Sequence, residues 1–276
     1  MTAPAKAAVV GAGSWGTALA LVLHGKGIRV SLWSHAREVP EQVRETGENP
    51  FLPDVPLPPE LEVTSSLADA LAGAELVVSV SPSQFVGTVM GRAGPHLSPE
   101  ALVVSASKGV EHGTLRTMDQ VLSEVLPPGM EARIAVLSGP SFAVEVARGV
   151  PTAVVVASRE KEVRRVLQGW FTTERFRVYT SPDVVGVELG GAVKNVIALA
   201  AGVVAGLEFG HNTQAALMTR GLAEITRLGV AMGAEAATFS GLAGMGDLVL
   251  TCTGELSRNR TVGYRLGKGE PLQAIL

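Results

Sequence analysis

The chain has 276 residues, of which 46% are hydrophobic and 18% are charged, so it can bury a sizeable core in one large domain or two ordinary ones. Its formal net charge of -3 argues against a general nucleic-acid binder, which normally carries a basic surface. The single cysteine, Cys252, excludes a disulfide framework and a cysteine-based metal site.

The N-terminal segment enters a structured pattern almost at once. Its short apolar run leads directly into a glycine turn, so we expect no signal peptide. The longest apolar stretch, about residues 184–207, is interrupted by Glu188 and Lys194, and it predicts a buried helix and no membrane span. Together these features predict a cytoplasmic protein.

Short apolar runs alternate with helical patterns through the first 180 residues. Strands are predicted at residues 7–13, ending in glycine, and at 28–33, 75–80, 102–107, 133–139, 152–158 and 176–181. Helices are predicted at residues 14–27, closed by a glycine, and at 84–93, 114–126, 141–149 and 160–171. Apolar strands separated by helices predict an α/β fold with a mainly parallel, doubly wound sheet.

The pattern changes near residue 180. Ser181 is predicted as the N-cap of a long helix, with Pro182 at its first position and Asp183 in its first turn. A second helix is predicted over 212–233. We therefore expect a Rossmann-like domain over residues 1–180 and an all-helical domain over 181–276. The proline-rich stretch 49–61 predicts an ordered loop. The chain stops within a helical pattern, and we expect the helical domain to continue further.

The sequence GAGSWG places Gly11, Gly13 and Gly16 in G-x-G-x-x-G spacing, between a predicted strand and a predicted helix. In a dinucleotide-binding fold the first glycine permits the tight turn, the second lets the backbone approach a pyrophosphate, and the third permits close helix–sheet packing. The N–H groups near Ser14 and Trp15 would then bind phosphate. The alternative is a tight turn that binds no ligand.

The end of the second strand indicates which nicotinamide cofactor fits. NAD sites usually carry an acid there for the ribose 2′-OH, but residues 33–37 contain none, and the first acid is Glu38. His35 and Arg37 instead suit a 2′-phosphate. We expect NADPH or NADH as cofactor, with NADP favoured. A solvated loop is the alternative for these two side chains.

Two further strand ends carry candidate ligand-binding residues. Lys108 follows the run LVVSAS, at the edge of the sheet where open α/β folds bind ligands. Gly139 and Ser141 follow another strand and open a helix, which favours an anion. The alternatives are a surface lysine and a turn capped by Ser141.

The stretch 241–260 is the second dense region. Asp247 is its only acid before Glu255, and it is suited to orienting a lysine or binding a substrate hydroxyl. Ser257, Arg258 and Asn259 begin a run of polar donors that suits a phosphate. A solvated basic turn is the alternative.

Lys194 lies in the apolar run GGAVKNVIALAAG, where an ammonium is costly to bury without a partner or a function. Burial lowers a lysine's pKa toward the range in which a general acid–base group works best, and a second cation such as Lys108 would lower it further. An Asp247 carboxylate would oppose this shift and hold the ammonium in place. A structural, ion-paired lysine is the alternative.

Other reactive side chains show no such pattern. Cys252 has no histidine nearby in sequence and is predicted to be a small buried thiol. The five histidines show no metal-ligand spacing, so no metal site is expected. His211 and Asn212, at the start of a predicted helix, are expected to cap it.

Five segments carry a resemblance to a known family: GAGSWGTALA, SASKGVE, LSGPSFAVEVARGVPTAVVVAS, VYTSPDVVGVELGGAVKNVIALAAG and GLAGMGDLVLTCTGELSRNR. In this order they closely resemble the NAD(P)-dependent glycerol-3-phosphate dehydrogenases of the bacterial type. The resemblance runs from about Lys6 to Gly269, and GGAVKN and LTCTGELSRNR are its most specific parts. Members usually continue for another helix or two, with further cofactor contacts.

The resemblance implies a Rossmann-like domain, a helical domain, and a cleft between them. It implies the interconversion of dihydroxyacetone phosphate and sn-glycerol 3-phosphate, which feeds glycerophospholipid synthesis, and it hints at a homodimer. Lys194 matches the proton acceptor of the family. Substrate contacts are implied at Lys108, Gly139, Ser141, Asp247, Ser257, Arg258 and Asn259. Cofactor contacts are implied at Ser14, Trp15, His35, Lys108, Ala143 and Arg258.

Two rival functions remain open on the sequence. One is a related oxidoreductase acting on a 3-hydroxy acid or a nucleotide sugar, and a sugar-nucleotide oxidase would need Cys252 as a nucleophile. The other is a non-catalytic NADPH sensor, which would have little use for Lys194, Asp247 and the basic turn together.

Overall fold

The computed structural model of the chain describes residues 5–275. The described chain forms two compact units. The first runs to Leu137 and resumes over Ser141–Pro182, and the second comprises Ser138–Pro140 and the chain from Asp183 onward.

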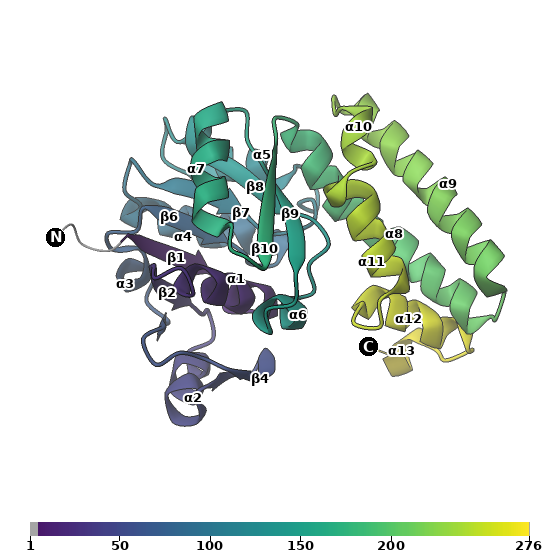
Figure 1. The fold of residues 1–276 in the computed structure, drawn as a ribbon, viewed down its shortest axis with the longest axis horizontal. Helices are drawn as coiled ribbons and strands as arrows, with labels where there is room; N and C mark the ends of the chain where they lie inside the picture. Colours follow the sequence, from purple (N-terminus) through teal and green to yellow (C-terminus); the bar gives the residue numbers. More distant parts are fainter. Residues whose placement is uncertain (1–4, 276) are drawn as a thin grey trace. The chain divides into compact units, whose positions relative to one another are not determined.

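The first unit is built on an eight-stranded sheet (Figure 1) in the order β10-β9-β8-β7-β6-β1-β2-β5. Its strands are β1 (Lys6–Val10), β2 (Arg29–Trp33), β5 (Glu62–Thr64), β6 (Leu76–Ser79), β7 (Leu102–Ser105), β8 (Ile134–Ser138), β9 (Thr152–Ala157) and β10 (Phe176–Ser181). β1 pairs in parallel with β2 on one side and with β6 on the other. The chain therefore reverses its direction of winding between β1 and β6, and ligands of doubly wound sheets bind at such a switch point. The predicted doubly wound, parallel sheet is confirmed.

Helices cover both faces of this sheet, because its strands carry apolar side chains on both sides. Leu19, Leu23 and Phe171 pack in one core cluster, and Met90 and Leu122 pack in the other. The helices of the first cluster are α1 (Ser14–His24), α6 (Ala143–Ala147) and α7 (Lys161–Phe171). Those of the second are α3 (Leu67–Leu71), α4 (Val86–Ala93) and α5 (Met118–Val125). Short 3-10 turns occur at η1 (Ser83–Phe85), η2 (Gly94–His96) and η3 (Glu131–Arg133).

The segment between β2 and β5 contains structure that the sequence analysis did not predict. α2 (Glu38–Thr46) is followed by a small antiparallel hairpin of β3 (Glu48–Asn49) and β4 (Leu52–Pro56). The expected proline-rich loop is thus partly a hairpin. Leu52, Val55 and Leu57 anchor it, since all three are buried.

The second unit is helical, and no strand follows β10 within the described residues. Its elements are α8 (Val184–Gly206), α9 (Gly210–Ala231), α10 (Ala236–Phe239), the π-helix η4 (Leu242–Gly246), α11 (Asp247–Thr253), α12 (Arg258–Gly267) and α13 (Leu272–Ile275). By length and composition alone α8 could cross a membrane, a test that core helices also pass. Here α9, α11 and α12 pack against it, so we interpret α8 as the central helix of the unit.

The start of α8 corrects the predicted cap. Asp183, and not Ser181, is the N-cap, since its carboxylate accepts the Gly186 N–H at 2.8 Å. Ser181 is instead the last residue of β10. The same carboxylate accepts the Thr238 hydroxyl at 2.6 Å and the Glu235 N–H at 2.9 Å. An acid at this position therefore ties the start of α8 to the start of α10, which a serine could not do.

Two other predicted helix starts are also wrong. α5 begins at Met118, four residues after its predicted start, because Thr117 and Gln120 form a capping box there. α9 begins at Gly210, so His211 and Asn212 lie inside its first turn, and no side chain caps this helix.

Small residues set the distance between α8 and α12. A Cβ on Gly202 would overlap the Arg260 carbonyl oxygen, and one on Gly263 would overlap the Leu199 carbonyl oxygen. The two helices therefore approach with their backbones nearly in contact.

Replacing Gly202 with alanine should force the two helices apart and lower the free energy of unfolding by about 1–3 kcal/mol. Gly169→Ala in α7 is the matched control, because a Cβ there meets no heavy atom within 4 Å. Alanine favours a helix, so the control should raise stability by up to about 1 kcal/mol. Urea denaturation of both variants measures the difference, and equal effects would contradict the close packing.

Candidate functional site

The glycine turn after β1 lies at the switch point of the sheet. Gly11 has a φ of +132°, and a Cβ there would lie 2.9 Å from the Val80 carbonyl carbon, at the end of β6. A Cβ on Gly16 would overlap the Gly11 carbonyl oxygen, so no side chain fits at this position of α1. A Cβ on Gly13 would meet no heavy atom within 4 Å, and Gly13 is exposed. The backbone of the turn is thus closely packed at Gly11 and Gly16, whereas Gly13 faces open space.

The polar groups of this turn fit the phosphates of a dinucleotide. No side chain caps α1, so the N–H groups at its start are available to an external acceptor. The indole Nε1 of Trp15 is buried and makes no hydrogen bond within the described residues. Ser14 and Trp15 are half-buried. An uncapped helix start and a buried donor beside a glycine turn are what a phosphate-bearing cofactor would satisfy.

The end of β2 carries the residues expected to distinguish the two nicotinamide cofactors. Trp33 is buried, and its indole donates to the Ser65 carbonyl oxygen at 3.1 Å. His35 is exposed, with its ring centroid 6.1 Å from that of Trp33. Arg37 is exposed and stands at the N-cap position of α2. Both side chains are therefore accessible to a ligand.

The loop that carries Lys108 is held against the loop that follows β6. Ser107 Oγ donates to the Ser81 carbonyl oxygen at 2.5 Å. Gln84 bonds this loop twice, donating to the Val110 carbonyl oxygen and accepting the His112 N–H, both at 2.8 Å. These contacts fix the half-buried Lys108 at the carboxyl end of β7.

The loop after β8 carries the next candidates. Gly139 has a φ of +141° and is buried. Pro140 lies beside η4, since its ring would be 3.6 Å from a Cβ on Gly246. Ser141 does not cap a helix, because the N-cap of α6 is Phe142, so the capping alternative is wrong. Ala143 is the first residue of α6 and is half-buried.

Lys194 and Asp247 form an ion pair inside the second unit. Lys194 lies in α8 with 7% of its surface exposed, Asp247 is the first residue of α11 with 1% exposed, and Lys194 Nζ donates to Asp247 Oδ1. A Cβ on Gly190 would overlap the Ala243 carbonyl oxygen, so the π-helix that precedes Asp247 lies directly against α8. The apolar helix and the glycine-rich segment thus bring the two charges together, and their mutual neutralisation offsets the cost of burial.

The basic turn forms the start of α12. Ser257 is buried and caps this helix by accepting the Arg260 N–H at 3.3 Å. Arg258 is exposed and Asn259 half-buried in the first turn, where the helix dipole favours an anion. The buried Nε of Arg260 makes no hydrogen bond within the described residues. The stretch is therefore a capped, cationic helix start instead of a fully solvated turn.

Cys252 lies near this pair and this turn. Its side chain is fully buried, and burial raises the pKa of the thiol to about 11, although the nearby charges of Lys194 and Arg260 oppose the shift. The thiol is therefore neutral near pH 7 and has little nucleophilic character. The prediction of a small buried thiol is confirmed.

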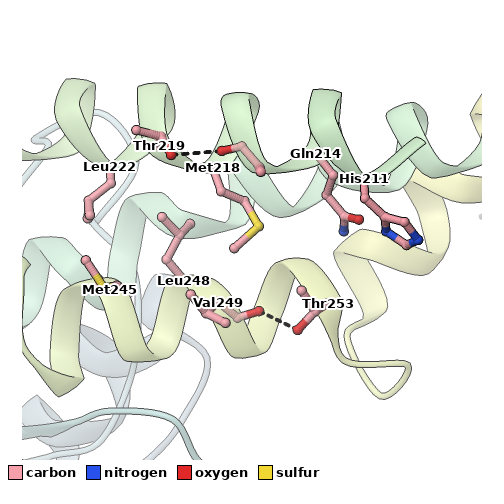
Figure 2. Close-up of a pocket in the computed structure, with 10 residues that line it drawn as sticks. His211, Gln214, Met218, Thr219, Leu222, Met245, Leu248, Val249 and Thr253 are labelled. Atoms are coloured by element: carbon pink, nitrogen blue, oxygen red, sulfur yellow. Dashed lines mark hydrogen bonds between the residues drawn. The ribbon is translucent and has the colours of Figure 1, made fainter. Parts of the chain in front are cut away.

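A separate groove lies between α9 and α11, as Figure 2 shows. It encloses about 340 Å³, and Met218, Leu222, Met245 and Leu248 give it apolar walls. The hydroxyls of Thr219 and Thr253 bond to carbonyl oxygens of their own helices, at 2.9 and 2.8 Å. Among the lining residues that the structure describes there is no predicted site residue and no lysine or arginine, and His211 lies at one end of the groove.

The sequence analysis missed one residue beside the glycine turn. Asn49, in β3, is fully buried and donates to the Ala12 carbonyl oxygen at 2.9 Å and to Thr17 Oγ1 at 2.8 Å. Its signal in the sequence was an amide at the start of the proline-rich stretch 49–61. Among the residues that the structure describes, no group of three His, Cys, Asp or Glu side chains is placed to hold a metal.

A doubly wound sheet with a glycine turn at its switch point, followed by a helical unit that buries a lysine–aspartate pair, defines a two-domain nucleotide-binding protein of the Rossmann class. Comparison with known proteins identifies the family. Residues 6–164 match the profile of the NAD-dependent glycerol-3-phosphate dehydrogenase N-terminus, and residues 183–276 match that of the C-terminus. The chain belongs to the NAD-dependent glycerol-3-phosphate dehydrogenase family.

Individual relatives agree with this assignment. The chain is 57% identical to a glycerol-3-phosphate dehydrogenase (NAD(P)+) of Geobacter sulfurreducens, over 97% of this chain and 80% of the relative. It is 58% identical to the protein of the same name from Geobacter metallireducens, over 98% and 81%. A crystal structure of glycerol-3-phosphate dehydrogenase from Coxiella burnetii superposes with a TM-score of 0.92 at 40% identity, covering 99% of this chain and 83% of that one.

The buried thiol gives a direct test of the site's chemistry. Since its pKa is raised to about 11, Cys252 of the native protein should react with DTNB at pH 8 roughly 100-fold more slowly than in the unfolded protein. Cys252→Ser should retain turnover with dihydroxyacetone phosphate. Fast labelling together with an inactive serine variant would instead indicate a cysteine nucleophile.

Proposed function

We propose that this chain catalyses the interconversion of dihydroxyacetone phosphate and sn-glycerol 3-phosphate with NADH or NADPH, using Lys194 as the general acid–base group. The observation that carries the proposal is the buried Lys194–Asp247 pair on α8 and α11. An apolar helix retains a lysine only with a partner or a function, and here the Asp247 carboxylate accepts a hydrogen bond from the ammonium.

Reduction of the ketone requires a proton donor for the developing alkoxide, and oxidation of the alcohol requires the reverse. A lysine ammonium supplies that proton, and its neutral amine takes it back. Asp247 holds Nζ in position and stabilises the protonated form. Lys108 adds a second cation for the polarised oxygen and the substrate. The bound cofactor supplies or accepts the hydride.

The substrate's phosphate does not react, so its binding can orient the carbon that does. We assign this role to Arg258 and Asn259 at the start of α12, which Ser257 caps. A guanidinium fork, an amide and the positive end of a ten-residue helix together suit a dianion. Gly139, with backbone donors, and Ser141, with its hydroxyl, complete the proposed substrate contacts.

The proposed cofactor contacts are the glycine turn with Ser14 and Trp15, together with His35, Lys108, Ala143 and Arg258. We favour NADP because His35 and Arg37 are exposed at the end of β2, and the first acid there, Glu38, already lies in α2. In the cell, the product would serve as the glycerol backbone of phospholipids. We further propose that the enzyme is cytoplasmic and works as a homodimer.

Lys194→Ala should lower kcat for NADPH oxidation with dihydroxyacetone phosphate about 100-fold to 10,000-fold, the usual contribution of a general acid. Its Kd for NADPH should stay close to that of the wild type, because Lys194 lies outside the glycine turn. Stopped-flow absorbance at 340 nm and NADPH fluorescence titration measure the two quantities.

The matched control is Lys161→Ala, which removes an exposed lysine at the start of α7 and should leave both values unchanged. Turnover by Lys194→Ala at the wild-type rate would make Lys194 structural. A wild type that binds NADPH but turns over no dihydroxyacetone phosphate would favour the sensor function.

The cofactor assignment has its own test. Arg37→Ala should lower the ratio of kcat/KM for NADPH to that for NADH by about tenfold, because a charge-assisted bond to the 2′-phosphate is lost. Arg44→Ala, an exposed arginine in the last turn of the same helix, is the control. An unchanged ratio in Arg37→Ala would exclude this residue from cofactor choice.

A further inference from the structure

The amide of Asn49 is fully buried, and both its nitrogen and its oxygen make hydrogen bonds. Nδ2 donates to the Ala12 carbonyl oxygen at 2.9 Å and to Thr17 Oγ1 at 2.8 Å. Oδ1 accepts the Phe51 N–H at 2.9 Å. The residue therefore joins the β3–β4 hairpin to the glycine turn, across 37 residues of sequence.

Thr17 extends this chain of bonds to a second carbonyl of the turn. Its hydroxyl accepts from Asn49 and donates to the Gly13 carbonyl oxygen at 2.9 Å. The Thr17 N–H also bonds that oxygen at 2.9 Å. Asn49 thus bonds the Ala12 carbonyl directly and is linked to the next carbonyl, that of Gly13, through the Thr17 hydroxyl.

Holding these carbonyls fixes the directions of two N–H groups. In a planar trans peptide, the C=O of one residue and the N–H of the next point in opposite directions. With the Ala12 and Gly13 carbonyls turned toward Asn49 and Thr17, the N–H groups of Gly13 and Ser14 are directed away from them. These are donors of the uncapped start of α1, where Gly13 leaves open space for a ligand.

We infer that Asn49 is a positioning residue for cofactor binding, which preorganises the N–H groups of Gly13 and Ser14 to bind the cofactor's pyrophosphate. This inference rests on the proposed function. Asn49 itself does not touch the cofactor and acts through Ala12 and Thr17. Preorganised donors lose no orientational freedom on binding, so their effect is on affinity.

An asparagine is required here because two donors and one acceptor are needed on one short side chain. Aspartate keeps the acceptor for the Phe51 N–H but cannot donate to the Ala12 carbonyl. It also adds a negative charge close to the proposed phosphate site. Asn49→Asp therefore separates anchoring of the hairpin from orientation of the turn.

The test compares affinity with stability in the full chain. Asn49→Ala should raise the Kd for NADPH roughly tenfold, about the worth of one or two hydrogen bonds. The Kd for ADP-ribose, which has the pyrophosphate but no nicotinamide, should rise by the same factor. KM for NADPH should rise in parallel, while kcat at saturating NADPH stays within about twofold. Asn49→Asp should weaken both ligands at least as much.

Two further variants act as controls. Thr17→Val removes the hydroxyl that accepts from Asn49 and donates to the Gly13 carbonyl, but it keeps the bond from Asn49 to Ala12. Its Kd should rise about threefold, and it tests the inference if Asn49→Ala does not fold. Thr46→Val removes an exposed hydroxyl that bonds within α2 and to Glu48 of the hairpin, and its Kd should not change.

Several results would overturn the inference. A lowered melting temperature in Asn49→Ala and Asn49→Asp, together with the wild-type Kd for both ligands, would make Asn49 a hairpin anchor only. A fall in kcat without a change in KM would also contradict it. Failure of the wild type to bind NADPH would overturn both this inference and the proposed function. If the wild type binds NADPH but does not reduce dihydroxyacetone phosphate, only the proposed function fails.

Discussion

The second unit is organised around one buried ion pair, Lys194 with Asp247. An ammonium in an apolar helix is costly, and breaking such a pair by removing one partner commonly destabilises a protein by about 3–5 kcal/mol. The surrounding structure makes this contact possible. Small residues in α8 allow η4 to pack closely against it, and Asp247 follows η4 as the first residue of α11. A hydrophobic pair would pack at least as well. Under the proposed function, the pair is retained for its chemistry and not for stability, and it would connect the fold of the helical unit to acid–base catalysis.

The proposed role of the first unit is different: its glycine turn, which contains no lysine or arginine, would bind the phosphates of the cofactor. Gly11 and Gly16 bring strand, turn and helix together, and Gly13 leaves the space open. The donors are backbone N–H groups, so their directions depend on where the neighbouring carbonyls bond. The β3–β4 hairpin, a separate two-stranded sheet, bonds the Ala12 carbonyl through Asn49, and in our inference this contact supplies that control. The proposed glycine-turn contacts to the cofactor thus lie in the first unit and the proposed acid–base group in the second, each with its own positioning contacts.

The doubly wound sheet and the helical second unit followed from the sequence, because apolar runs and glycine spacing are local signals. Lys194 and Asp247 could be singled out for the same reason, as charged residues in otherwise apolar or glycine-rich stretches. The predicted cap of α8 was wrong because Ser181 is part of β10. The actual cap, Asp183, also accepts hydrogen bonds from Glu235 and Thr238 at the start of α10, more than fifty residues away. Asn49 was missed because its partners Ala12 and Thr17 lie 37 and 32 residues away. Local patterns reveal elements and isolated charges, whereas hydrogen bonds between distant segments require the fold.

Chemical rescue of Lys194→Ala by small primary amines tests the central claim most directly, since the truncated side chain leaves room for an exogenous amine beside Asp247. If Lys194 transfers the proton, ethylamine and its homologues should restore NADPH oxidation with dihydroxyacetone phosphate, at rates that depend on the pKa of the amine. Tetramethylammonium, which carries the charge but no transferable proton, should not restore it. Equal rescue by tetramethylammonium, or by amines irrespective of their pKa, would contradict the account, because Lys194 would then contribute charge alone.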